Sequence, residues 1–297
     1  AGRTSPLASS ARGPRLNGGT SRPDQPPLAT ASSSPVDGGP APSACPEDMV
    51  LVDGRYCPAV VHECLEWHPA YLKEQKRLEG LRARGEPVGR SNVAARCLRF
   101  REPSTCATER RPLRFCMDRY EWPNVAGKLP QVLTSWTQAR DTCRGVGKRL
   151  CNEHEFNFAC EGEQVLPYTY GFRRDATRCA IDRPYIRGST RFMHYDACLA
   201  DDECRAALAE VDQRVPIGAM PRCVSPFGVH DLNGNVDEWV LRIGEEAPSR
   251  SGLKGGWWGP LRNRCRPITT FHLESDYGYG IGFRCCRDAT AAEGSSE

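Results

Sequence analysis

The pattern of hydrophobic and polar positions predicts few regular elements along this chain. Residues 49–52 (MVLV) are apolar and are followed by Asp53-Gly54, which predicts a strand that ends in a tight turn. Residues 134–146 carry apolar side chains at helical spacing, which predicts a helix. Much of the remaining sequence is rich in Gly, Pro and aromatic residues, so we expect short strands and much irregular chain.

Three other segments predict helices. Residues 152–160 begin with Asn152 and carry Glu155 three residues later, which is the signature of a capping box. Residues 68–85 place a few apolar side chains among many charges, which predicts a solvated helix within an insertion. Residues 198–210 predict a further short helix.

The ends of the chain differ from the rest in composition. Of residues 1–44, 22 are Pro, Gly or Ser, and none is Cys, aromatic or Met. Such a segment cannot bury enough apolar area to offset its ordering entropy, so we interpret it as a disordered linker. It lacks the apolar stretch of a signal peptide and is typical of a tether, and we expect a membrane anchor in a segment that precedes it. Residues 291–297 are expected to form a disordered tail.

Hydropathy and charge exclude two classes of protein. The mean hydropathy is −0.55, and no run of about 18 apolar residues predicts a membrane-spanning helix. The chain has 40 basic and 37 acidic residues, which gives no argument for a nucleic-acid partner.

The cysteines indicate the compartment. The 16 cysteines are dispersed, and none forms a C-x-x-C pair, which removes the usual signature of zinc ribbons and thioredoxin-like sites. A large, even and scattered set is typical of disulfides made in an oxidising compartment. We therefore expect almost all of these cysteines to be paired, in an extracytoplasmic protein that is periplasmic, exposed at the cell surface or secreted.

One polar segment is a candidate for metal binding. Residues 231–238 (DLNGNVDE) combine carboxylate and amide oxygens with a backbone that Gly234 allows to bend. Hard oxygen ligands at this density suit Ca²⁺. The alternative is a polar turn between two strands. A zinc site of the H-E-x-x-H type is excluded at His154-Glu155, because Phe158 stands in place of the second histidine.

Residues 227–240 (FGVHDLNGNVDEWV) form the longest of several ordered blocks that match known sequence motifs. They resemble FGLyDmhGNVwEWv, the core of the formylglycine-generating enzyme family, also called sulfatase-modifying factors. The other blocks, in the family's order, are the MVLV strand at 49–52, Ser135-Trp136 with Ala139 (vsWxxA), residues 147–156 (GKRLCNEHEF, like GKRLPTEaEWe), residues 254–258 (KGGWW, like RGGSW) and residues 281–284 (IGFR, like iGFR). Five of these blocks lie between about residues 116 and 286.

The resemblance implies an α+β fold, the C-type-lectin-like formylglycine-generating-enzyme fold. It has a small mixed sheet, two or three helices, much irregular chain and, here, many disulfides. The folded domain is expected over residues 45–290, with an insertion over about 62–112. Because lectin-like folds tie a helix to the last strand, Cys143 is expected to pair with Cys285 or Cys286. Adjacent residues of a strand face opposite ways, so these two cysteines should take different partners.

The resemblance also implies a calcium site in the GNVwEW loop. Carried over by position, the ligands are the side chains of Asp231 and Glu238 with the carbonyl oxygens of Leu232, Gly234 and Val236.

The chemistry of active family members depends on positions that differ in this chain. Active members oxidise a cysteine of a sulfatase to formylglycine, using Cu(I) held by two thiolates that lie four and nine residues after the second Gly of GGS. Counted from Gly256, these positions are Pro260 and Cys265, and the Ser of GGS is Trp257. One thiolate cannot make a two-coordinate Cu(I) site, so copper is not expected. Cys265 is the remaining catalytic candidate, and the alternative is that Cys265 is a plain disulfide partner.

Two functional hypotheses follow. The first is an extracytoplasmic formylglycine-generating-enzyme-like domain without maturase activity, which acts as a binding or accessory module for a protein, peptide or glycan ligand. The second is a metal- or thiol-dependent oxidoreductase that modifies a protein or peptide at Cys265. Arg262, Arg264 and Arg266 near Trp257-Trp258 either form a ligand surface or a solvated, salt-bridged face.

Overall fold

The computed structural model describes residues 43–89, 91, 93–188 and 194–290. The predicted linker, apart from Ser43 and Ala44, and the predicted tail at 291–297 lie outside these residues. The helices are α1 (Pro69–Ala83), α2 (Trp136–Gly145), α3 (Glu153–Glu161), α4 (Tyr195–Leu199) and α5 (Asp202–Val211). The strands are β1 (Met49–Tyr56), β2 (Val60–Val61), β3 (Cys64–Trp67), β4 (Cys97–Phe100), β5 (Thr105–Cys106), β6 (Arg111–Asp118), β7 (Arg149–Leu150), β8 (Asp237–Leu241), β9 (Ser251–Lys254), β10 (Ile281–Phe283) and β11 (Cys285–Arg287).

A four-stranded sheet joins the two ends of the folded chain. Its order is β1-β6-β11-β7, and all neighbours that pair are antiparallel. Val50 and Val52 on β1 are buried, as are Phe115 and Met117 on β6, whereas Leu51 is exposed. This alternation is that of a sheet with one face on the core. The predicted strand at 49–52 is therefore confirmed, although β1 continues through Asp53-Gly54 to Tyr56.

A three-stranded sheet positions the candidate site. Its order is β10-β8-β9, with β8 parallel to β10 and antiparallel to β9. Asp237 lies opposite Ile281, and Glu238 lies opposite Lys254. The sheet therefore brings together the segments around residues 237, 254 and 281, which are far apart in the sequence.

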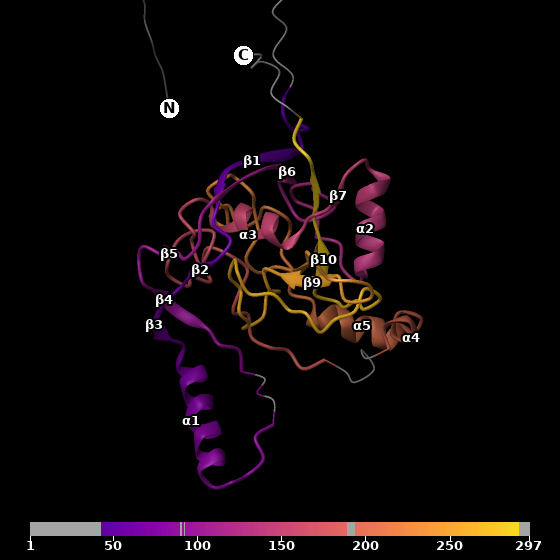
Figure 1. Ribbon diagram of the computed structural model, residues 1–297. Helices are drawn as coiled ribbons and strands as arrows, with labels where there is room; N and C mark the ends of the chain where they lie inside the picture. The colour runs from indigo at the N-terminus through magenta and orange to yellow at the C-terminus, as the bar shows by residue number, and fades with distance from the viewer. Residues whose placement is uncertain (1–42, 90, 92, 189–193, 291–297) are drawn as a thin grey trace, which may run out of the picture. The chain divides into compact units, whose positions relative to one another are not determined.

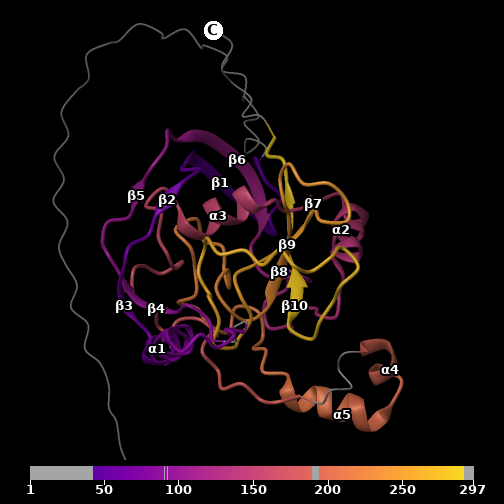
Figure 2. The ribbon, with the colours of Figure 1, turned by 60° about the horizontal axis from the view of Figure 1, so that its bottom comes forward.

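Two helices that were predicted from local signals pack against these sheets. Ser135 and Gln138 form a capping box at the start of α2, and Asn152 and Glu155 form one at the start of α3. In Figure 1, α3 lies under β1 and α2 lies beside β7. The apolar side of α3, including Phe156, is fully buried in the main core. The short helix predicted at 198–210 is instead two helices, α4 and α5, which pack together in Figure 2.

The predicted insertion at 62–112 contains a two-stranded unit of its own. Strands β3 and β4 pair antiparallel, and helix α1 follows β3 as predicted for residues 68–85. Figure 1 shows α1 directed away from the two larger sheets. Leu78 is buried on this helix, whereas most of its other side chains are exposed or partly exposed.

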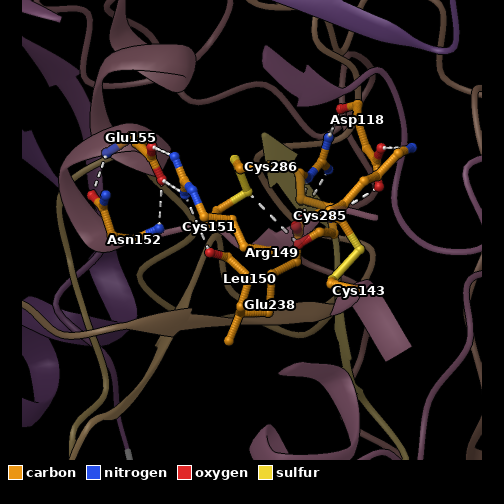
Figure 3. Close-up of a disulfide and its surroundings, with 12 residues drawn as sticks. Asp118, Cys143, Arg149, Leu150, Cys151, Asn152, Glu155, Glu238, Cys285 and Cys286 are labelled. Carbon is orange, nitrogen blue, oxygen red and sulfur yellow. Dashed lines mark hydrogen bonds and ion pairs between the residues drawn. A yellow bond between two sulfur atoms is a disulfide. The ribbon is translucent and has the colours of Figure 1, made fainter. Parts of the chain in front are cut away.

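All sixteen cysteines are bonded in eight disulfides, which confirms the prediction of pairing. The pairs are Cys45–Cys116, Cys57–Cys106, Cys64–Cys97, Cys143–Cys285, Cys151–Cys286, Cys160–Cys265, Cys179–Cys223 and Cys198–Cys204. Cys285 and Cys286 leave β11 toward different partners (Figure 3), as expected for neighbours on a strand. In the part of the chain that is described, no helix is long and apolar enough to cross a membrane.

Candidate functional site

The loop that resembles the family core, residues 231–236, enters β8 through a tightly packed turn. Asp231, Gly234 and Asn235 have left-handed backbone angles, with φ of 61°, 90° and 58°. A Cβ atom on Gly234 would lie 2.3 Å from the carbonyl oxygen of Ala180, so only glycine fits there. The side chain of Asn233 accepts a hydrogen bond from the Thr169 amide at 2.8 Å. The amide oxygens of this loop therefore hold the backbone in place.

Three buried carboxyl groups gather around this loop with one guanidinium group. Glu238 accepts hydrogen bonds from Arg284 on both of its oxygens, at 2.5 and 2.7 Å. Glu121 accepts from the Asn235 side chain at 2.7 Å and from the Val236 amide at 3.2 Å. Asp231 accepts from the Gly218 amide at 2.9 Å. We call Glu121, Asp231 and Glu238 the buried acidic cluster.

Arg284 supplies one positive charge, whereas the three carboxyl groups of the buried acidic cluster would carry three negative charges if all were ionised. Burial, with a smaller contribution from the neighbouring Glu238, raises the pKa of Asp231 to about 6, against the opposing effects of the Gly218 amide and Arg284. Burial and the charges of Asp231 and Glu238 hold the pKa of Glu121 well above its ordinary value. The cluster is therefore neutralised by protons or by an additional cation.

The predicted calcium ligands fit an ion only in part. The excess of buried negative charge suits a cation, and Asp231 has a carboxylate oxygen beyond the one that meets Gly218. Glu238 does not fit, because both of its oxygens face Arg284. Within the described ranges, no group of three or more His, Cys, Asp or Glu is placed to hold a metal ion. The calcium site at Asp231, Leu232, Gly234, Val236 and Glu238 stays a prediction.

Cys265 is not a free thiol. Its sulfur is bonded to that of Cys160 on α3, and both residues are fully buried. A sulfur atom in a disulfide is not a thiolate, so the alternative interpretation of Cys265 as a disulfide partner is confirmed, whereas its catalytic role stays a prediction. No cysteine of the described residues, which include all sixteen, is free.

A cavity of about 280 Å³ lies beside Trp257, at the position that carries serine in active family members. Its wall includes Asp237 from β8, Arg262, Phe271 and His272. We call it the Trp257 cavity. Burial raises the pKa of Asp237 to about 7, and contact with the Gly256 backbone opposes this shift. Asp237 was missed as a site residue, although the acid in place of the family's Trp in GNVwEW was a signal available in the sequence.

Residues 109–289 match the family model described as a sulfatase-modifying factor enzyme 1-like domain. The chain belongs to this family. Two relatives carry the name "Inactive C-alpha-formylglycine-generating enzyme 2". The protein of Bos taurus is 29% identical over 192 residues, which are 58% of each chain, and the protein of Mus musculus is 28% identical over 172 residues, which are 54% of this chain and 50% of that one. The chain thus spans between half and three fifths of the length of these relatives.

Solved structures that match this chain are more distant in sequence. PvdO from Pseudomonas aeruginosa has a TM-score of 0.44 and 17% identity over 84% of this chain and 98% of that one. The structure titled CarF has a TM-score of 0.49 and 14% identity over 82% of this chain and 99% of that one. Family membership, the small mixed sheets and the eight disulfides confirm the predicted α+β class. The described residues form five helices, more than the two or three predicted, because α1 lies in the insertion and α4 and α5 are separate.

The three arginines near the tryptophan pair do not form one surface in this family member. Arg262 is exposed at the wall of the Trp257 cavity. Arg264 lies over the ring of Phe100, with its guanidinium carbon 5.3 Å from the ring centroid. Arg266 pairs with Glu161, Nε to Oε2 at 2.6 Å. Of the two alternatives for these arginines, Arg266 therefore follows the salt-bridged one, although its side chain is largely buried, and Arg264 packs on an aromatic ring. Trp258 is fully buried, and only Trp257 reaches the cavity.

Proposed function

We propose that this chain is an extracytoplasmic formylglycine-generating-enzyme-like protein that lacks sulfatase-maturase activity and acts as a binding or accessory module. The observation that carries the proposal is the Cys160–Cys265 disulfide, which leaves no thiolate for Cu(I). The names of the two inactive relatives point the same way. The competing hypothesis, an oxidoreductase that acts through Cys265, loses its reactive group.

The disulfides support the proposed compartment. Eight pairs, with no free cysteine among the described residues, are typical of proteins that fold in an oxidising environment. The periplasm, the cell surface and the extracellular space all meet this condition.

The Trp257 cavity is the proposed binding surface for a protein, peptide or glycan ligand. Trp257 and Phe271 supply the aromatic part of its wall. Aromatic walls with a few polar groups are typical of ligand sites, and here Asp237 and His272 supply the polar groups. An indole face also stacks on peptide side chains and on sugar rings, which suits both ligand classes.

We expect Trp257→Ala to remove ligand binding. Labelled protein is applied to peptide and glycan arrays, and the affinities of the hits are then measured in solution. Loss of the aromatic wall should weaken each hit at least about tenfold, the cost of a binding-site aromatic contact. Trp67→Ala is the matched control, because Trp67 packs against Tyr71 with tilted rings outside this cavity. Equal affinities for the two variants, or no hit on either array, would argue against the proposal.

We also propose a calcium ion at the 231–238 loop, supported by the excess charge of the buried acidic cluster. Millimolar Ca²⁺ should then raise the melting temperature above that in EDTA, by about 5–10 °C if the ion is 100 times above its dissociation constant. Asp231→Asn should abolish this rise, whereas Asp141→Asn, at an exposed residue on α2, should not. An identical melting temperature in EDTA and Ca²⁺ would leave protons as the neutralising charge.

A further inference from the structure

Besides β3, strand β4 also pairs with residues 172–174, and this pairing places two arginines opposite each other. The Phe100 amide donates to the Phe172 carbonyl at 2.9 Å, and the Arg174 amide donates to the Leu98 carbonyl at 2.9 Å. Arg99 and Arg173 lie directly opposite each other as an antiparallel bridge pair. Because the hydrogen bonds flank this pair, it is of the non-hydrogen-bonded kind, in which the two side chains share one face and lie closest.

Two like charges in this position repel each other. Directly opposed like charges destabilise a sheet, so the arrangement needs compensation. Arg99 has Glu66 at 3.6 Å, and both side chains are exposed to solvent. Arg173 is exposed, and it forms no ion pair with an acidic side chain among the described residues. The next residue, Arg174, is different: it is buried and pairs with Asp182 through two bonds, at 2.6 and 3.0 Å.

Arg99 and Arg173 both line a cavity of about 570 Å³. Arg101 and Arg178 also line it, together with the rings of Tyr170 and Phe172. Two carboxylates, Glu102 and Asp175, lie on the same wall. The lining therefore carries four arginines and two carboxylates, and two further acids, Glu63 and Glu66, pair with Arg101 and Arg99 from outside it.

Part of this charge is already used by neighbouring acids. Arg101 forms a two-bonded pair with Glu63. Arg178 lies 3.5 Å from Asp175, which also accepts from the Thr177 amide. Arg99 lies 3.6 Å from Glu66, and Arg173 forms no ion pair with an acid of the described residues, so this opposed pair retains donors for a ligand.

We propose that Arg99 and Arg173 bind an oxyanion, a phosphate or sulfate group, in this cavity. The planar guanidinium group donates two parallel hydrogen bonds to such groups, and a shared anion would replace the repulsion of the pair by attraction. The cavity is larger than one oxyanion, so a sugar that carries the group has room against Tyr170 and Phe172. This oxyanion site shares no residue with the Trp257 cavity and does not depend on the function proposed there.

The test compares Arg99→Gln, Arg173→Gln and the matched control Arg82→Gln, which changes an exposed arginine on α1. Without phosphate, each of the first two variants should melt about 1–3 °C higher than the wild type, because the repulsion is removed. Inorganic phosphate should raise the melting temperature of the wild type and of Arg82→Gln, but not of Arg173→Gln. The affinity for phosphate, from calorimetry, should fall at least about tenfold in Arg99→Gln and Arg173→Gln.

Two controls make the proposal falsifiable. Chloride at the same ionic strength should give a smaller shift than phosphate, and an equal shift would reduce the effect to screening and overturn the site. An equal loss of affinity in Arg82→Gln would also overturn it. A sulfated disaccharide is titrated in parallel: tighter binding than inorganic phosphate identifies an ester on a glycan, and equal binding identifies a free oxyanion. Binding of neither probe contradicts the proposal.

Discussion

Replacing Arg284 by methionine is expected to lower the free energy of unfolding by about 3–5 kcal/mol. Arg284 and Glu238 are each about 1% exposed and meet through two hydrogen bonds. Methionine fills part of the space but leaves the Glu238 carboxylate buried without its counter-charge, beside two other acids. Urea denaturation, monitored by circular dichroism, measures the change.

Two variants separate lost charge compensation from lost packing. The double variant Glu238→Gln/Arg284→Met removes both charges and should recover much of the stability that Arg284→Met loses. Arg242→Met removes an arginine whose partner, Glu245, is solvent-exposed, and it should cost about 1 kcal/mol or less. A loss below about 1 kcal/mol in Arg284→Met would contradict the role given to the pair. If calcium binds the loop, Arg284→Met should also depend more strongly on Ca²⁺ than the wild type.

Local signals predicted the parts of the fold that are encoded locally. Asn152 with Glu155 predicted the start of α3 because both partners of a capping box lie within four residues. The number and dispersion of the cysteines predicted that they would be paired, and the resemblance placed Cys143 against the last strand. The break between α4 and α5 was missed, although Asp201, whose side chain accepts a hydrogen bond from the Cys204 amide at the start of α5, was an N-cap signal in the sequence.

The candidate site depended on partners that lie far apart in the sequence. Glu121 meets Asn235, and Arg284 meets Glu238, across separations that no periodic pattern reports. The oxyanion site depends on a bridge between β4 and residues 172–174, which is a feature of the tertiary structure. The resemblance identified the loop at residues 231–236. The charged groups around it, Glu121 and Arg284, come from distant segments and are brought there by the tertiary structure.

The partner of Cys265 could not be predicted by counting along the sequence. Cys265 lies nine positions after Gly256, the spacing of the second active-site cysteine in active family members, if no gap intervenes. The structure places it against Cys160, a buried residue on the apolar side of α3 that is 105 residues away in the sequence. The spacing match therefore did not reveal that Cys265 is a half-cystine.

The last expectation is that this protein does not convert cysteine to formylglycine, even when Cu(I) is supplied. Two-coordinate Cu(I) needs two thiolates in fixed geometry, whereas Pro260 has no ligand atom and Cys265 is bonded to Cys160. A C-x-P-x-R sulfatase peptide is incubated with the protein, Cu(I) and O₂, and the product is measured by mass spectrometry beside an active family member. The native protein should show no free thiols, and no formylglycine should form.

Two matched variants decide whether Cys265 has latent chemistry. Cys160→Ser breaks the disulfide and frees Cys265, whereas Cys265→Ser breaks the same disulfide and leaves Cys160 free. Both variants lose a cross-link between residues 105 apart, which costs on the order of 4–5 kcal/mol, so circular dichroism must first show that they fold. Neither should form the product, because one thiolate does not complete the copper site. Formylglycine from the wild type would refute the absence of maturase activity, and formylglycine from Cys160→Ser alone would identify Cys265 as a catalytic thiol held inactive by its disulfide.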